Sequence, residues 1–239
     1  MRAAVRITFL IFLGVLVVTG IGLWQQWSWL NVPRQYNPFA PLDIVDEPTF
    51  VTKWKLKQLG DQPERCMAVL ARARDEGAID YLPVNDTTIG NCPLTNVVRV
   101  RKTGVQFNNS FLATCPLAVT WTMFERHGLQ PAAQSVFGEN VTRVDHVGSF
   151  ACRNIYHRKN ARLSEHATAE AFDVTGFRLA DGTRIRVLKD WDDENKKSMF
   201  LHRALNQACD FFGNALGPEY NAAHANHFHL GMRGFMICR

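Results

Sequence analysis

Residues that could bind a metal ion gather in two short segments of the chain. Four of the eight histidines lie there: His166 in the first segment, and His224, His227 and His229 in the second. Asp173 follows His166 after six intervening residues, a spacing that suits a loop leading into a strand and not one face of a helix. His227 and His229 stand two positions apart, so on a strand both side chains point to the same face. The sequence therefore predicts that the functional residues lie in these two segments.

Two imidazoles and one carboxylate form the nitrogen and oxygen set that a catalytic Zn²⁺ uses, with a fourth position left open. Zinc lowers the pKa of water towards 7, and a neighbouring base accepts the proton as a carbonyl is attacked. The chain has no HExxH motif, which many zinc peptidases use for two ligands and the base. The extra histidines are therefore expected to supply the proton chemistry. The alternative is that these histidines only complete buried strands, because an HxH pair often occurs without a metal.

The elements that would position these residues are short strands and amphipathic helices that do not alternate regularly. The clearest helix covers residues 194–212, where apolar side chains recur along one face. Further helices are predicted at 62–77 and from Pro116 to His127. Strands are predicted at 97–105, 141–150, 171–174, 183–187 and 226–230. This mixture predicts an α+β domain built on a small antiparallel sheet with flanking helices.

Residues 1–30 are predicted to be a membrane element. The run from Ile7 to Trp24 contains no charged residue and is long enough to cross a hydrocarbon core of roughly 30 Å. It is longer than the apolar region of a typical signal peptide, and no small-x-small cleavage site follows it. An uncleaved transmembrane helix is therefore favoured, with a cleaved signal peptide as the alternative. Arg2 and Arg6 precede the run, so we expect the chain after it to be exported.

Residues 31–53 contain four prolines and few regular apolar repeats, which is typical of a linker leading to a domain at 54–239. All six cysteines lie in that domain, without CxxC spacing. An even number in an oxidising compartment predicts three disulfides, with Cys238 fastening the C-terminal tail; six buried free thiols are the alternative. The net charge of +5 suits an anionic envelope polymer or a lipid surface. Because the domain is expected to be exported, no nucleic-acid partner is expected.

Several separated motifs make residues 54–239 recognisable. They are Ser164-Glu165-His166 with Asp173 six residues later, His227-Phe228-His229, Cys115-Pro116-Leu117, and the segments 148–154, 172–177 and 216–224. Together they resemble the bacterial extensin-like C-terminal domain family, which looks related to the LAS zinc peptidases (lysostaphin, D-Ala-D-Ala peptidases and hedgehog-type domains). The resemblance implies a LAS/hedgehog-like fold. For a bacterial protein, the predicted topology gives a single inner-membrane span with the C-terminal domain in the periplasm.

The resemblance also implies roles for individual residues. His166, Asp173 and His229 match the three metal ligands, so Zn²⁺ is the expected cofactor. His224, His227 and His229 have the spacing of the histidine trio in the penicillin-insensitive murein endopeptidases. His227, the middle member, is therefore expected to act as general base or transition-state donor, with His224 as a further catalytic residue.

Arg153 resembles the arginine that D-Ala-D-Ala peptidases carry before the ligand loop. Its guanidinium could bind a developing oxyanion or a substrate carboxylate, and a surface arginine beside a disulfide is the alternative. Two residues depart from the pattern. Ala169 replaces a usual glycine, and Asn226 stands where D-Ala-D-Ala dipeptidase relatives carry the acid that serves as the base. Asparagine cannot accept the proton, so either His227 does so or the site only binds metal.

These implications predict a zinc-dependent peptidase that hydrolyses peptide cross-links of peptidoglycan. A D,D-endopeptidase is favoured over a carboxypeptidase because of the histidine trio. The expected partners are peptidoglycan stem peptides and, through the N-terminal helix, the inner membrane. A non-catalytic envelope module that binds metal or peptidoglycan is the alternative hypothesis. A disulfide-stabilised protein without a metal is the third.

Overall fold

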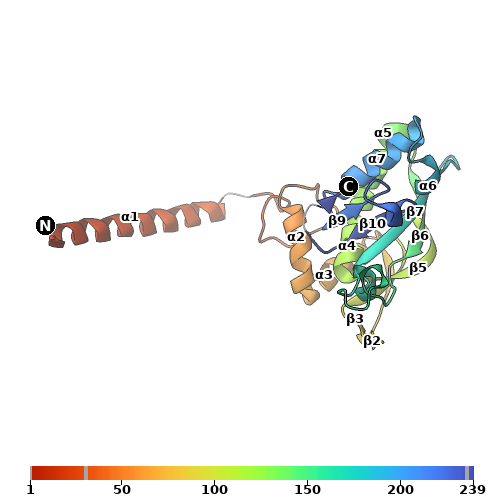
Figure 1. Ribbon diagram of the computed structural model, residues 1–239. Coiled ribbons are helices and arrows are strands. Elements are labelled where there is room, and N and C mark those ends of the chain that lie inside the picture. Colours follow the sequence, from red (N-terminus) through yellow and green to blue (C-terminus); the bar gives the residue numbers. More distant parts are fainter. Residues whose placement is uncertain (1, 30–31, 235–236) are drawn as a thin grey trace.

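The computed structural model describes residues 2–29, 32–234 and 237–239, beginning with a single long helix (Figure 1). This helix, α1 (Arg2–Trp29), contains the window Arg6–Leu23, which is long and apolar enough to cross a membrane. None of the window is buried against the rest of the protein. The predicted membrane element is thus confirmed as an apolar helix of sufficient length. Its predicted end at residue 30 lies outside the described residues.

The domain is built on one large twisted sheet. In the described part of the chain, nine strands form this sheet in the order β1-β4-β5-β6-β7-β10-β9-β11, with β8 paired to β7. Strands β2 and β3 form a separate hairpin. The strands are β1 (Asp80–Pro83), β2 (Thr87–Ile89), β3 (Cys92–Leu94), β4 (Val97–Lys102), β5 (Gln106–Thr114), β6 (Val141–Gly148), β7 (Ala171–Leu179), β8 (Arg184–Arg186), β9 (Asn214–Leu216), β10 (Phe228–Gly231) and β11 (Ile237–Cys238).

The predicted α+β class is confirmed, but the prediction of a small antiparallel sheet is wrong. The sheet is large, and the β5–β6 and β9–β11 pairs are parallel. The error has a physical cause. Strand β5 carries Asn108, Asn109 and Ser110 in its middle, residues with a low preference for strands, and β9 has only three residues. Tertiary pairing, and not local pattern, makes them strands.

Helices pack around the sheet and supply much of the core (Figure 1). All ten side chains of the central helix α4 are buried, which explains why it is apolar on every face. The helices after α1 are α2 (Thr52–Gln58), α3 (Pro63–Asp75), α4 (Cys115–Phe124), α5 (Gln130–Phe137), α6 (Val187–Asp190) and α7 (Lys196–Ala208). Short turns are the 3₁₀ helices η1 (Leu59–Asp61), η3 (Ile155–His157), η4 (Glu165–Thr168) and η5 (Ala222–His224), and the π-helix η2 (Glu125–Leu129).

An aromatic cluster under the sheet fixes the strand that matters for the site. Phe172 of β7 is fully buried, stacks on Phe111 with ring centroids 4.1 Å apart, and meets Trp121 of α4 at 5.1 Å. Side chains alternate along a strand, so the burial of Phe172 turns its neighbour Asp173 to the opposite face. Strand β10 pairs with β7 in the same register, with Leu230 opposite Phe172. The core therefore sets the orientation of the site residues.

Three disulfides cross-link the domain, as predicted. They join Cys66 to Cys115, Cys92 to Cys152 and Cys209 to Cys238. The first connects α3 to α4. The second ties β3 to the residue before Arg153. The third holds the C-terminal tail to the end of α7, so Cys238 does fasten the tail.

The proline-containing segment predicted as a linker contributes to the domain. Leu42 and Ile44 are buried in the main core, and His127 Nε2 lies 2.8 Å from the Ile44 carbonyl oxygen. Part of this segment is therefore packed and not free. The boundaries predicted for the linker and the domain stay a prediction.

Candidate metal centre

The first segment of the site, residues 164–170, is a tight loop that leads into β7. Ser164 caps the short helix η4, accepting a hydrogen bond from the His166 backbone N–H at 3.3 Å. The His166 ring is buried and its Nδ1–H donates to the Ser149 carbonyl oxygen at 3.1 Å. Because a carbonyl can only accept, the proton stays on Nδ1 and the lone pair of Nε2 faces the site.

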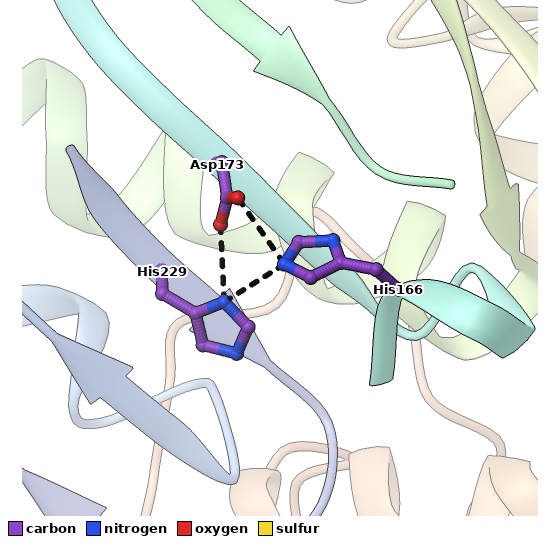
Figure 2. A group of neighbouring side chains, drawn as sticks. All are labelled: His166, Asp173 and His229. Atoms are coloured by element: carbon purple, nitrogen blue, oxygen red, sulfur yellow. Dashed lines mark hydrogen bonds and ion pairs between the residues drawn. The ribbon is translucent and has the colours of Figure 1, made fainter. Parts of the chain in front are cut away.

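Asp173 and His229 face the same point from two neighbouring strands. They are direct partners in the antiparallel β7–β10 register, and Figure 2 shows both side chains turned towards His166. The Nε2–H of His229 donates to Glu165 Oε2 at 3.3 Å. When the ring is neutral, its Nδ1 carries the lone pair that faces the site, as Nε2 does in neutral His166. The structure thus brings together the three residues that the sequence predicted as ligands.

The distances within this group fit the ligand shell of a small cation. His166 Nε2 lies 3.2 Å from His229 Nδ1 and 3.1 Å from Asp173 Oδ2, while His229 Nδ1 lies 3.0 Å from Asp173 Oδ1. In a tetrahedral zinc site with metal–ligand distances of about 2.0–2.1 Å, the ligand atoms stand roughly 3.4 Å apart. Two ring lone pairs and a carboxylate in mutual contact repel one another unless a proton or a metal ion lies among them. The donor set therefore fits zinc.

The electrostatics of the group also favour a cation. Burial raises the pKa of Asp173, but hydrogen bonds from the His166 and His229 rings, made when those rings carry an additional proton, outweigh burial and hold this pKa well below its usual range. Burial lowers the pKa of His229, yet hydrogen bonds to Asp173 and Glu165 reverse this and raise it to about 9. Without a metal, the group therefore holds a proton at neutral pH. A bound metal ion would replace this proton, as metal binding generally requires.

Glu165 is hydrogen-bonded to the ring nitrogen of His229 that faces away from the other two ligands, and the sequence did not reveal this role. One carboxylate oxygen accepts from His229, while Asn214 Nδ2 and the Arg233 backbone N–H donate to the same carboxylate at 3.0 and 2.7 Å. Burial raises the pKa of Glu165, but these hydrogen bonds bring it below its usual value. A ring N–H held by a carboxylate is a common second layer around zinc-binding histidines. The only signal in the sequence was an acid directly before His166.

His227 and His224 stand beside the group, each held by an asparagine. His227 Nδ1–H donates to Asn226 Oδ1 at 2.7 Å, and His227 Nε2 lies 3.6 Å from Asp173 Oδ1. His224 Nδ1–H donates to Asn221 Oδ1 at 2.8 Å. Burial, and then the neighbouring histidine charges, lower the pKa of His224 to about 4; burial is also the main cause that lowers the pKa of His227. Both rings are therefore neutral at pH 7, with Nε2 free to accept a proton.

Arg153 acts on His227 through its charge. Its charge is one of the factors that lower the pKa of His227, which places the guanidinium within electrostatic reach of that ring. Among the described residues, no acceptor is hydrogen-bonded to this guanidinium. Tyr156, close by, is half exposed and its hydroxyl accepts from Asn221 Nδ2 at 3.1 Å. Arg153 is thus an uncommitted cation within electrostatic reach of His227.

Sequence comparison assigns the family. Residues 64–239 match the family described as "Extensin-like protein C-terminus". The chain belongs to this family. The match includes every residue of the site from Arg153 to His229. A search of curated proteins and a search of solved structures gave no significant match.

In this extensin-like domain, the ligand loop is closed by the C-terminal segment. The Arg233 guanidinium donates to Glu170 Oε2, the Leu163 carbonyl oxygen and Thr168 Oγ1 at 2.8, 2.8 and 2.9 Å. Ala169, where a glycine was expected, has φ +54° and is fully buried. The left-handed backbone explains why glycine is favoured at this position, and the small methyl group explains why alanine is accepted. The relation of the family to the LAS peptidases stays a prediction.

Proposed function

We propose that this protein is a membrane-anchored, zinc-dependent peptidase that hydrolyses peptide cross-links of peptidoglycan on the periplasmic side of the bacterial inner membrane. His166, Asp173 and His229 would hold the zinc ion. His227 would accept the proton of the attacking water, His224 would assist it, and Arg153 would bind the substrate. A D,D-endopeptidase is favoured over a carboxypeptidase on the spacing of the histidine trio.

One observation carries the proposal. Two imidazole nitrogens and a carboxylate, from three separate elements, converge within 3.2 Å of one another while their other ring nitrogens are tied to Ser149 and Glu165. Histidines that only complete a buried strand need no such arrangement. A site whose outer hydrogen bonds fix both tautomers is preorganised to bind a metal.

His227 and Asn226 would handle the proton of the attacking water. When bound, zinc polarises a carbonyl and lowers the pKa of water towards 7. His227 is neutral and its Nδ1–H is held by Asn226, so its Nε2 can accept a proton. This nitrogen lies 3.6 Å from Asp173 Oδ1, beside the metal ligands. Asn226 is thus not the base but orients it, which accounts for the missing acid. After bond cleavage, the same nitrogen can return the proton to the leaving amine.

Arg153 would stabilise negative charge on the substrate. Its guanidinium offers several N–H donors in one plane, which suits the carboxylates of stem peptides or an oxyanion that develops during attack. The fold does not determine which bond is cut, so the choice of bond depends on the residues around the site.

The proposal is tested by digestion of purified, cross-linked peptidoglycan with the full chain in detergent, followed by mass spectrometry of the products. We expect cross-linked dimers to disappear, the loss to stop with a chelator, and added zinc to restore it. Unchanged dimers with a folded, zinc-loaded protein would contradict the proposal. Release of single terminal D-alanines without loss of dimers would identify a carboxypeptidase instead.

A non-catalytic envelope module that binds metal or peptidoglycan is the second candidate, and Asn226 is the observation that favours it. With asparagine in place of the acid, only a histidine is left to accept a proton. His227→Gln separates the two candidates. An enzyme loses turnover and keeps its zinc, whereas a binding module shows no turnover in either form and the same zinc content.

A further inference from the structure

Residues 34–50, which we call the proximal loop, form a closed structure between α1 and α2. The Arg34 guanidinium makes two hydrogen bonds to Asp46, at 2.8 and 2.7 Å, and an ion pair with Asp43 at 2.8 Å. Thr49 Oγ1–H donates to the Gln35 carbonyl oxygen at 2.6 Å, which joins the two ends. The loop therefore has a defined shape, as compact surface loops with neighbouring ends do.

This loop holds aromatic rings out of the protein. Phe39 and Phe50 are each 85% exposed, more than any other large apolar side chain whose exposure the structure describes. Tyr36 is half exposed and its ring centroid lies 6.4 Å from that of Phe50. Single exposed apolar residues need no explanation. Two almost fully exposed phenylalanines on one ordered loop, with Tyr36 beside one of them, mark an interaction surface.

The position of the loop in the chain, close to the end of α1, places it near the membrane if α1 spans one. Tyr36 follows the last residue of α1, Trp29, by seven residues, so it lies within roughly 25 Å of that helix end. The polar interface of one leaflet extends roughly 5–8 Å beyond the hydrocarbon core. If α1 spans the bilayer, the proximal loop is held close to that interface.

A cavity beside the loop is lined by basic side chains. Residues 38–42 form one wall of this cavity of about 330 Å³, and α2 and α3 form the other, with Lys55, Arg65 and Arg72 as its charged lining residues. Lys55 is buried and its Nζ donates to the Arg34 carbonyl oxygen at 2.9 Å, while Arg72 pairs with Asp43 at 3.2 Å and with Glu76 at 3.1 Å. Among the described lining residues, Arg65 is therefore the cation without an acidic partner. Exposed aromatic rings beside a cation suit the interface of a phospholipid bilayer.

We propose that the proximal loop docks on the outer surface of the bilayer that α1 spans. Phe39 and Phe50 insert at the boundary between headgroups and acyl chains, and Arg65 faces the phospholipid phosphates. The inference rests on the membrane anchor in the proposed function, and is independent of the peptidase activity. Its consequence is a domain with a fixed orientation at the membrane, in place of one that moves freely on a linker.

Photo-cross-linking of the full chain in liposomes of anionic phospholipid tests this surface. Phe39→p-benzoylphenylalanine and Phe50→p-benzoylphenylalanine are compared with the same probe at Val147 and Leu188, which are also highly exposed. We expect at least about tenfold more lipid adduct, detected by mass spectrometry, from the loop positions.

The outcomes separate the claims. Equal lipid yields at the loop and control positions, with the chain retained in the vesicles, would overturn the docking and leave the anchor intact. Adducts between two copies of the chain in place of lipid adducts would make the loop a dimer interface and overturn the proposal. Release of the chain from vesicles by alkaline carbonate would overturn the anchor and the docking together. None of these results depends on hydrolysis of peptidoglycan.

Discussion

Asp173 is a largely buried carboxylate and Glu125 a fully buried one, but their surroundings have opposite effects on the pKa of each. Asp173 lies against two imidazoles, and their hydrogen bonds overcome burial and keep its pKa far below the usual range. Glu125, at the end of α4, is 5% exposed and faces the Thr103 hydroxyl and the Trp121 indole. Burial is the main cause that raises its pKa to about 7, although these hydrogen bonds lower it.

The difference teaches what burial does without a cation. Removal from water favours the neutral acid, and neutral donors only reduce this effect, as at Glu125. An ionised carboxylate inside a protein needs positive charge beside it, and Asp173 has imidazoles where that charge can reside. One carboxylate therefore belongs to the packing of the core, and the other to a site for a cation.

Removal of the Asp173 charge should have the largest effect, because it abolishes the difference between the ionised Asp173 and the neutral Glu125. In Asp173→Asn a neutral amide stands between two lone-pair nitrogens, so we expect zinc affinity to fall by more than about 100-fold and dimer cleavage to disappear. Zinc affinity is measured by competition with a chelating dye, and the exposed Asp192→Asn is the matched control. Unchanged affinity in Asp173→Asn would show that the three residues do not hold the metal.

His227→Gln sharpens the division between binding and chemistry. The side chain stays polar but can no longer accept a proton, so kcat/KM should fall by about 10²–10⁴-fold while the zinc content stays the same. His202→Gln, where the ring packs on Trp191 away from the site, is the control. If activity survived in His227→Gln, another group would have to be the base.

Glu125→Gln tests the other carboxylate. The pKa of Glu125 is raised from 4.5 to about 7, so its protonated form is favoured in the folded state. The contribution of this group to the free energy of unfolding is fully present below pH 4.5 and is lost as pH rises through about 7. We expect the free energy of unfolding of the wild type to fall by about 3 kcal/mol between pH 4.5 and pH 8 from this group. The glutamine variant should lack this fall.

Urea unfolding at several pH values, with the disulfides intact, measures the effect. The difference between variant and wild type is taken at each pH, so that groups common to both cancel. Parallel pH profiles for the two proteins would contradict the burial of an acid at Glu125. Zinc affinity should be the same in both, because Glu125 is not part of the site.

Glu165→Gln should have the smallest effect. Glutamine keeps the size of the side chain but removes the charge that holds the His229 Nε2–H, so zinc affinity should fall by about 10–100-fold. The exposed Glu219→Gln is the control, in the same dye competition. An unchanged affinity would mean that the carboxylate only holds the C-terminal segment through Arg233.

The sequence was most informative where local pattern and tertiary structure agree. The helix predicted at 194–212 is α7 (Lys196–Ala208), whose apolar stripe packs on the core. Strands predicted at 171–174 and 226–230 are within β7 and overlap β10, and their alternation put Asp173 and His229 on one face. The candidate ligands could be found because side-chain type and the period of a strand are local properties.

Other features could not be predicted because they depend on distant contacts. Glu165 acts through Asn214 and Arg233, which come from β9 and the C-terminal segment. The role of Asn226 appears only when its Oδ1 is seen to accept from His227. The size of the sheet followed from the pairing of β5 and β9, whose sequences show little strand character. Hydrogen bonds of this kind leave no periodic signal.

X-ray absorption at the zinc edge of the full chain, loaded with one equivalent of zinc, tests the central claim most directly. The proposal predicts one tightly bound zinc per chain, with two imidazole nitrogens and oxygen ligands at about 2.0–2.2 Å and no sulfur. The imidazole signal should be lost in His166→Ala. A folded chain that binds no zinc, or a spectrum without imidazole, would contradict a metal centre formed by His166, Asp173 and His229.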